Sequence, residues 1–226
     1  MDSRSSSITI AHLIINSLAA HMKDLKADFI LCRSDIICIT ETWLSHRHSD
    51  SSVKIDSFNI LRVDRESCYN SDQIDTSKLP YGGVCSYTSV EWSLQPLHYQ
   101  YQTKRIEFEL FNAERDSQSV LILHVYRPPW LTLKDFTRDL LQIMDKMNEL
   151  TTLIVGDFNI NIFKEPNNSL LRTLVAKDFH QVVCHPTHVS GSCIDHIYIK
   201  KEYIYDIRLL PVPYSQHAGI QINIKV

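Results

Sequence analysis

Short apolar segments with the composition of β-strands recur along almost the whole chain, and they limit its possible folds more than any other feature. Several of them alternate: Ile220, Ile222 and Ile224 share one face of an extended backbone, with polar residues on the other face. Such alternation predicts strands that bury one face. The predicted strands are residues 8–15, 36–40, 84–87, 106–111, 120–126, 152–155, 194–199 and 218–226.

Helical periodicity is confined to a few stretches between these strands. Residues 18–29 and 133–147 carry apolar side chains at the spacing of one helical face, and residues 170–174 indicate a shorter helix. Many strands with few helices indicate an α+β or layered α/β architecture. The pattern fits two packed sheets with helices outside.

Length and composition favour one folded unit. Hydrophobic residues make up 44% of the 226 residues, which is enough for a sizeable core. We expect a flexible polar tail over residues 1–7 and one domain over residues 8–226, with residues 66–80 as its most loop-like segment. No apolar run approaches the ~20 residues of a membrane helix, and the start of the chain lacks a signal-peptide pattern. We therefore expect an intracellular protein, nuclear or cytoplasmic and not secreted, without membrane contact.

The net charge of −3 limits how the chain could bind nucleic acid. Proteins that hold nucleic acid mainly by charge are basic, so any such contact here is expected to be local. The six cysteines include no C-x-x-C pair and several lie in apolar contexts, which predicts reduced structural thiols. A possible zinc-binding group consists of Cys184, His185, His188, Cys193 and His196. Zinc binding is disfavoured because the spacing of these residues matches no standard zinc finger.

The sharpest motif is Gly156-Asp157-Phe158-Asn159, which directly follows a predicted strand. If the backbone stays extended, Asp157 and Asn159 point the same way because they are two residues apart. A carboxylate can take a proton or orient a water, and an amide can bond a phosphate oxygen. An ordinary turn is the alternative, because Gly, Asp and Asn favour turns.

Glu41 ends another predicted strand, within Ile39-Thr40-Glu41-Thr42-Trp43-Leu44. A carboxylate at the end of an apolar strand lies at a sheet rim or is costly to bury unpaired. A hard cation would satisfy it, and Mg²⁺ typically uses only one or two protein carboxylates. A solvated strand end explains the residue equally well.

Two further motifs place polar groups at strand ends. Asp195 starts one predicted strand and His217 precedes another, so the carboxylate could hold the imidazole in one tautomer beside a phosphate if the strands are neighbours. Tyr126 and Arg127 end a strand before two prolines, and both could face a phosphate. A structural histidine and a plain strand stop are the alternatives.

Taken together and in this order, the motifs resemble those of the endonuclease/exonuclease/phosphatase family. They are most similar to the endonuclease domains of non-LTR (LINE-type) retrotransposons, relatives of apurinic endonucleases and deoxyribonuclease I. Each motif alone is weak, but the ordered combination is specific and spans nearly the whole chain. The matched segments are residues 8–18, 36–44, 81–87, 120–129, 153–160, 186–199 and 215–226.

The resemblance implies a four-layer αββα sandwich of the deoxyribonuclease I type, in the α+β class, that hydrolyses phosphodiesters. It implies that Glu41 is the main metal ligand, for Mg²⁺ or a substituting Mn²⁺. Asp157 would orient or deprotonate the attacking water, with Asn159 beside it on the phosphate. His217 would face the phosphate with Asp195 as its partner, and Tyr126 would be a further phosphate contact.

The sequence departs from the family pattern on the metal side. The family usually carries an Asn where this chain has Ile14, and an Asp where it has Gln216. An apolar side chain cannot bind the ion, and an amide brings no charge to it. Asn16 lies two residues after Ile14, so on an extended strand it would share that face and partly compensate as a metal ligand.

These observations predict a metal-dependent DNA endonuclease of retrotransposon origin. We expect it to be a monomer whose activity is reduced because Ile14 and Gln216 replace polar groups on the metal side. The first alternative is a catalytically inactive domain of the same fold that acts as a binding module or is a decaying element fragment. The second is a phosphatase that acts on a small phosphoester, which the acidic net charge mildly favours.

Overall fold

Two mixed β-sheets of six strands each pack face to face in the computed structural model, which describes residues 7–28, 30–69, 81–97, 105–146, 151–200 and 202–225. The first sheet runs in the order β11 (Tyr205–Leu210), β12 (Gly219–Lys225), β1 (Ser7–Ile14), β2 (Ile36–Thr40), β4 (Val84–Ser89) and β3 (Phe58–Val63). The second runs in the order β5 (Ser93–Pro96), β6 (Glu107–Arg115), β7 (Gln118–Tyr126), β8 (Thr151–Asp157), β10 (Asp195–Lys200) and β9 (Phe179–Gln181).

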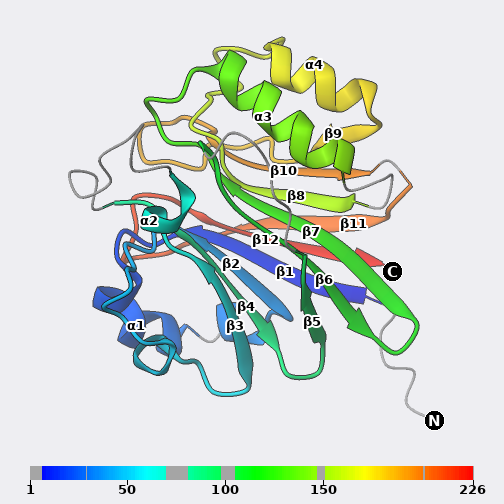
Figure 1. Cartoon of the computed structure of the whole chain (residues 1–226). Coiled ribbons are helices and arrows are strands. Elements are labelled where there is room, and N and C mark those ends of the chain that lie inside the picture. Colours follow the sequence, from blue (N-terminus) through cyan, green and yellow to red (C-terminus); the bar gives the residue numbers. More distant parts are fainter. Residues whose placement is uncertain are drawn as a thin grey trace.

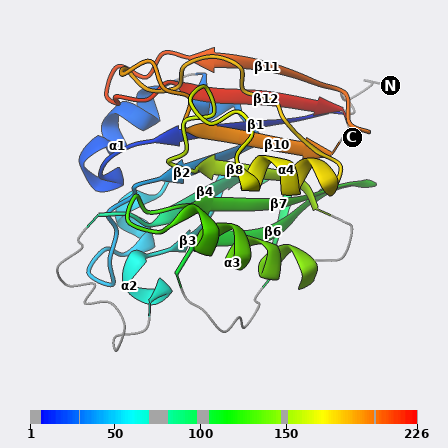
Figure 2. The ribbon, with the colours of Figure 1, turned by 90° about the horizontal axis from the view of Figure 1, so that it is seen from above.

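Helices cover the outer faces of both sheets (Figures 1 and 2). Helix α1 (Leu18–Ala27) packs on the first sheet, and α3 (Leu133–Lys146) and α4 (Ser169–Ala176) pack on the second. Short helices η1 (Leu31–Arg33), η2 (Asp50–Val53) and α2 (Arg65–Cys68) complete the list of helical elements described. The predicted αββα sandwich is confirmed. Within the described ranges, every helix is too short or too polar for a transmembrane span.

The core forms because the central strands bury both faces. On β1, Ile8 and Ile10 point into the layer between the sheets, while Ala11 and Leu13 point toward α1. This period-two division repeats on the other central strands and separates one inter-sheet core from two helix-covered cores. The six cysteines are free thiols, and the buried ones are Cys38, Cys68, Cys85 and Cys193.

The inward-facing residues change from apolar to polar toward one end of the sandwich. On β8, Leu153 and Val155 of the inter-sheet core are followed at the same spacing by Asp157. On β10, Ile199 and Ile197 lead in the same way to Asp195. The buried polar residues that continue the inward faces of other strands include His12, Thr40, Ser86, Glu107, Glu109, His124 and Tyr126. The fold therefore gathers polar groups at one rim of an otherwise apolar layer.

All the predicted strands are present, but the sheets also contain β3, β5, β9 and β11, which sequence periodicity did not predict. The predicted loop 66–80 is wrong at its start, where α2 includes Glu66, and residues 70–80 lie outside the described ranges. Ser7, placed in the predicted tail, begins β1, while residues 1–6 are outside the described part. The predicted 133–147 helix ends at Lys146 in the described chain.

Candidate active site

The polar rim is organised by the register of three neighbouring strands. Tyr126 at the end of β7 is the Cα partner of Asp157 on β8, and Asp157 is the partner of Asp195 on β10. Paired residues on adjacent strands project from the same face. The ladder therefore brings a phenol and two carboxylates together, which the sequence motifs placed only at separate strand ends.

Asp157 is buried, with 4% of its surface exposed, and is held by Asn159. The Asn159 main-chain N–H donates to Asp157 Oδ1 at 2.9 Å and its side-chain amide donates to Oδ2 at 3.2 Å. Burial raises the pKa of Asp157 well above its usual range, and the neighbouring carboxylates of Asp195 and Glu41 raise it further. Such a group is a stronger base than an ordinary aspartate when it is deprotonated.

The backbone does not stay extended from Asp157 to Asn159, so the condition for their side chains to point the same way is not met. Strand β8 ends at Asp157, and Asn159 adopts a left-handed conformation with φ of 50°. The side chains meet because the chain turns and the amide folds back onto the carboxylate. The Asn159 amide also donates to the carbonyl of Arg127 at 2.9 Å, so the turn is tied to the end of β7.

Asp195 and His217 form the next contact, with 2.8 Å between Asp195 Oδ2 and His217 Nδ1. The predicted contact assumed that the two strands are neighbours. They instead lie in different sheets. Asp195 starts β10 of the second sheet and His217 precedes β12 of the first, so the pair closes the rim between the sheets. Ser215 holds the histidine loop, because its hydroxyl donates to the carbonyl of Ile14 at 2.7 Å and accepts from His217 N at 3.0 Å.

Glu41 lies across the rim on the first sheet, in a half-buried position with a left-handed φ of 57°. Its Oε2 accepts a 2.7 Å hydrogen bond from the indole Nε1 of Trp43. Burial raises the pKa of Tyr126, and the charges of Glu41 and Asp157 and a hydrogen bond to Glu41 raise it further. The phenol therefore stays neutral and links the Glu41 side of the site to the Asp157 side.

Asn16 does not share the strand face of Ile14, because β1 ends at Ile14 and Asn16 turns with a φ of 48°. The backbone nevertheless places Asn16 beside Glu41, since Ile15 N donates to the Thr40 carbonyl at 3.2 Å and Ser17 N donates to the Glu41 carbonyl at 3.0 Å. The side chain of Ile14 is buried, whereas Gln216 is exposed.

Oxygen donors on this rim suit a hard cation. Within the described ranges, no three or more His, Cys, Asp or Glu residues are arranged as a metal cluster. Mg²⁺ accepts one or two protein carboxylates when waters complete its shell, and Glu41 and Asn16 stay its predicted ligands. Asp195 Oδ1 is buried without a hydrogen-bond partner among the described residues, which leaves one acceptor for a group from outside the chain.

The guanidinium of Arg127 is turned toward the main chain. Its Nη1 donates to the carbonyls of Phe158 and Asn159 at 3.2 and 3.1 Å, and its Nη2 donates to the carbonyl of Leu131. These contacts hold the Asp157–Asn159 turn in place. Because the guanidinium is engaged by these carbonyls, the geometry argues against a direct contact between Arg127 and a phosphate. That contact stays a prediction.

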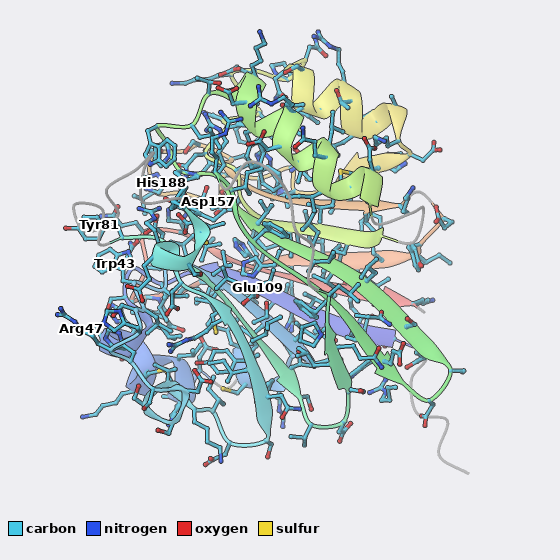
Figure 3. All side chains as sticks on the ribbon, in the orientation of Figure 1. Trp43, Arg47, Tyr81, Glu109, Asp157 and His188 are labelled. Carbon is cyan, nitrogen blue, oxygen red and sulfur yellow. The ribbon has the colours of Figure 1, made fainter. Side chains whose placement is uncertain are left out.

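Sequence motifs did not identify several residues of the rim. His188 packs edge-on against His217 with ring centroids 4.7 Å apart, and a β-bridge joins the two backbones. Trp43 was inside a predicted motif but carried no predicted role. Figure 3 shows Trp43, Tyr81, Asp157 and His188 at the same end of the molecule. The sequence signal that could have identified these residues is the presence of a histidine, His188, and a tryptophan, Trp43, in or beside the predicted motifs.

The other histidine of the predicted strand motif is structural. His196 is buried, its Nε2 lies 3.0 Å from the carbonyl of Ile160, and its Nδ1 lies 3.0 Å from the hydroxyl of Tyr198. Its ring stacks on Phe158 with centroids 4.8 Å apart. Its ring nitrogens are thus engaged within the second sheet and away from His217.

The family model for the endonuclease/exonuclease/phosphatase family matches residues 13–214. The chain belongs to this family. The predicted resemblance is thereby confirmed, and with it the general class of hydrolytic nucleases and phosphatases. Among curated proteins, no sequence matches the chain.

Several solved structures share the fold at low sequence identity. The endonuclease domain of TRAS1, a telomere-specific non-LTR retrotransposon, has a TM-score of 0.70 at 13% identity, over 97% of this chain and 98% of that one. The 3′ phosphatase NExo from Neisseria, bound to a product DNA hairpin, has a TM-score of 0.67 at 16% identity, over 95% and 98%. The human Nocturnin catalytic domain with bound sulfate has a TM-score of 0.67 at 14% identity, over 96% and 93%.

Proposed function

We propose that this member of the family is a divalent-metal-dependent endonuclease that hydrolyses a DNA phosphodiester with an activated water. The observation that carries the proposal is the convergence of Asp157, Asp195 and His217 at one rim, joined by strand register and a 2.8 Å carboxylate–imidazole contact. Two similar structures add support, since one is a retrotransposon endonuclease domain and the other is a 3′ phosphatase bound to a product DNA hairpin.

Asp157 is the proposed base. Burial and two neighbouring carboxylates raise its pKa, which increases its affinity for the proton of a water once it is ionised. Asn159 fixes the orientation of that carboxylate through two hydrogen bonds and is proposed to contact the phosphate as well. Arg127 acts as a positioning residue, because it holds the carbonyls of the same turn.

His217 is the proposed phosphate-facing group. Its contact with Asp195 occupies Nδ1, which orients the ring and leaves Nε2 to face the substrate. When Nε2 carries a proton, it would donate to a phosphate oxygen and stabilise charge that develops there. The neutral phenol of Tyr126 is proposed as a further donor at the centre of the rim.

Glu41 and Asn16 would hold the metal, Mg²⁺ or Mn²⁺. When bound, the cation would polarise the phosphate and stabilise the leaving oxygen. Ile14 and Gln216 leave this side of the site without the polar groups that the family usually has there. An inactive domain of the same fold is therefore the second candidate, and the buried Ile14 is the observation that favours it.

A plasmid assay separates these candidates. Purified protein is incubated with supercoiled plasmid and Mg²⁺ or Mn²⁺, with chelator as a blank. We expect nicking that Asp157→Ala and His217→Ala abolish, while His180→Ala, an exposed histidine on the edge strand β9, retains it. Absence of nicking with either ion, together with no phosphate release from a small phosphoester, would establish the inactive candidate. Phosphate release from a small phosphoester with intact plasmid would exclude the endonuclease.

A further inference from the structure

Two aromatic rings stand next to the proposed metal ligand and take no part in the chemistry described above. The ring centroids of Trp43 and Tyr81 are 4.6 Å apart, with an angle of 57° between the planes. Tyr81 is 54% exposed, although tyrosine rings usually bury much of their surface. Figure 3 shows both rings at the end of the molecule that carries Asp157 and His188.

The indole of Trp43 is fixed by the site itself. Its only polar atom, Nε1, donates to Glu41 Oε2 at 2.7 Å. The hydrogen-bonding capacity of the ring is therefore used, and what it can offer a ligand is an apolar π-face. A ligand on this face would lie within a few ångströms of the carboxylate proposed to hold the metal.

The backbone under the rings is strained and closely supported. Glu41 and Trp43 both have left-handed φ values, 57° and 54°, which are unfavourable for residues with a side chain. Trp43 N donates to the Gly82 carbonyl at 2.8 Å and Thr42 N to the Gly83 carbonyl at 3.3 Å. This backbone pairing places Tyr81 beside Trp43. Backbone strain of this kind persists only where surrounding contacts impose it.

A buried ion pair lies beneath the glycines. Glu107 accepts from Arg65 Nε at 2.6 Å, from the Tyr69 hydroxyl at 2.7 Å and from Gly83 N at 2.5 Å. A Cβ on Gly82 would meet the Arg65 guanidinium at 2.2 Å, and one on Gly83 would meet Thr42 Oγ1 at 2.4 Å. The rings are thus held in place before any ligand arrives, which lowers the entropy lost on binding.

We propose that Trp43 and Tyr81 form a stacking platform for one unpaired nucleobase of the strand whose phosphate occupies the active site. This inference rests on the proposed function and names the form of nucleic acid that the site accepts. A base is planar and apolar on its faces and is attached to a phosphate, which matches an aromatic pair beside an anion-binding rim. The net charge of −3 confines charge-based binding to local contacts, so base stacking would add to the affinity. Arg47, exposed in the same loop, adds one local positive charge.

The test measures binding with chelator present, so that it does not depend on cleavage. Fluorescence anisotropy compares a labelled oligothymidylate of about ten nucleotides, within the usual site size for single strands, with a strand of equal length made of abasic spacers. We expect the base-bearing strand to bind more tightly, on the order of tenfold or more. A fully paired duplex lacks this advantage because its bases are stacked on each other.

Variants test whether the preference for the base-bearing strand depends on Trp43 and Tyr81. Tyr81→Ala and Trp43→Ala are expected to remove the advantage of the base-bearing strand, whereas Trp43→Phe keeps the ring and retains it. Tyr205→Ala is the matched control, since Tyr205 is 41% exposed and pairs with Ile224 at the opposite end of β12 from His217. Circular dichroism checks that each variant is folded.

Three outcomes overturn the inference: no binding to the base-bearing strand, equal binding of the two strands, or a preference that survives Tyr81→Ala and Trp43→Ala. None of them decides the proposed function, because plasmid nicking with Mg²⁺ is measured separately. Nicking without a base preference leaves the endonuclease in place and removes the platform alone.

Discussion

The two sheets position their parts of the candidate site by different physical means. On the second sheet, Tyr126, Asp157 and Asp195 are register partners in a regular ladder, so backbone hydrogen bonds place them. On the first sheet, Glu41 lies just past the end of β2 in a left-handed conformation and depends on contacts with a paired loop. A ladder tolerates local substitutions because its many bonds are shared, whereas one strained loop relies on a few contacts. The Glu41 side should therefore be the more fragile.

The largest expected effect separates the roles of the two sides. Asp157→Asn should lower the nicking rate by ~10²–10⁴ because the proposed base is lost, and raising the Mg²⁺ concentration should not restore it. Glu41→Gln should also lower the rate, by ~10²–10³ for one charge-stabilising group, but added Mg²⁺ should restore part of it. Rates are measured across a Mg²⁺ titration. Equal rescue of both variants would contradict the division between the sides.

The next effect tests the fragility of the Glu41 loop. Gly83→Ala places a Cβ at φ of 87° against Thr42 Oγ1, whereas Gly191→Ala, at φ of 79°, meets nothing within 4 Å. Both should lose ~1–2 kcal/mol for the left-handed backbone. Gly83→Ala should lose a further ~1–3 kcal/mol from overpacking and weaken nicking as well. Urea unfolding gives both free energies. Equal losses would show that the contact under Glu41 is not tight.

A smaller effect is expected from restoring polar groups on the metal side. Ile14 is the Cα partner of Thr40, directly before Glu41, and Gln216 precedes His217. Ile14→Asn combined with Gln216→Asp should tighten Mg²⁺ dependence by ~10-fold or more, read as a lower Mg²⁺ concentration for half-maximal nicking. Ile14→Val is the control for lost apolar volume. No gain in the double variant would refute the account of a weakened metal side.

The smallest expected effect is the direction in which the stability of an Asp157 variant changes with pH. Because the folded-state pKa of Asp157 is raised, the folded protein binds more protons than the unfolded chain between the ordinary aspartate range and the raised value. The free energy of unfolding contributed by this group therefore falls as pH rises through that window. Asp157→Asn removes the ionisation, so its stability relative to wild type should grow with pH. Urea unfolding at acidic and neutral pH measures this. A difference that shrinks with rising pH would contradict the raised pKa.

Sequence patterns predicted the central strands and missed those at the sheet margins. The strands β3, β5, β9 and β11 stand at the four sheet edges. Their residues are less completely buried, and a segment such as Ser93–Pro96 lacks the apolar alternation of a central strand. An edge strand has one neighbour only, so pairing with that neighbour, and not its own composition, makes it a strand.

The candidate site divides in the same way. The sequence by itself determined the family, the αββα layering and the chemical types at strand ends, because period-two alternation and short motifs are local properties of the chain. Only the tertiary structure decided that Asp195 and His217 meet across the sheets, that Asn159 turns back onto Asp157 and that Trp43 ties its indole to Glu41. Those contacts depend on packing between distant segments and on left-handed backbone conformations, neither of which a local pattern encodes.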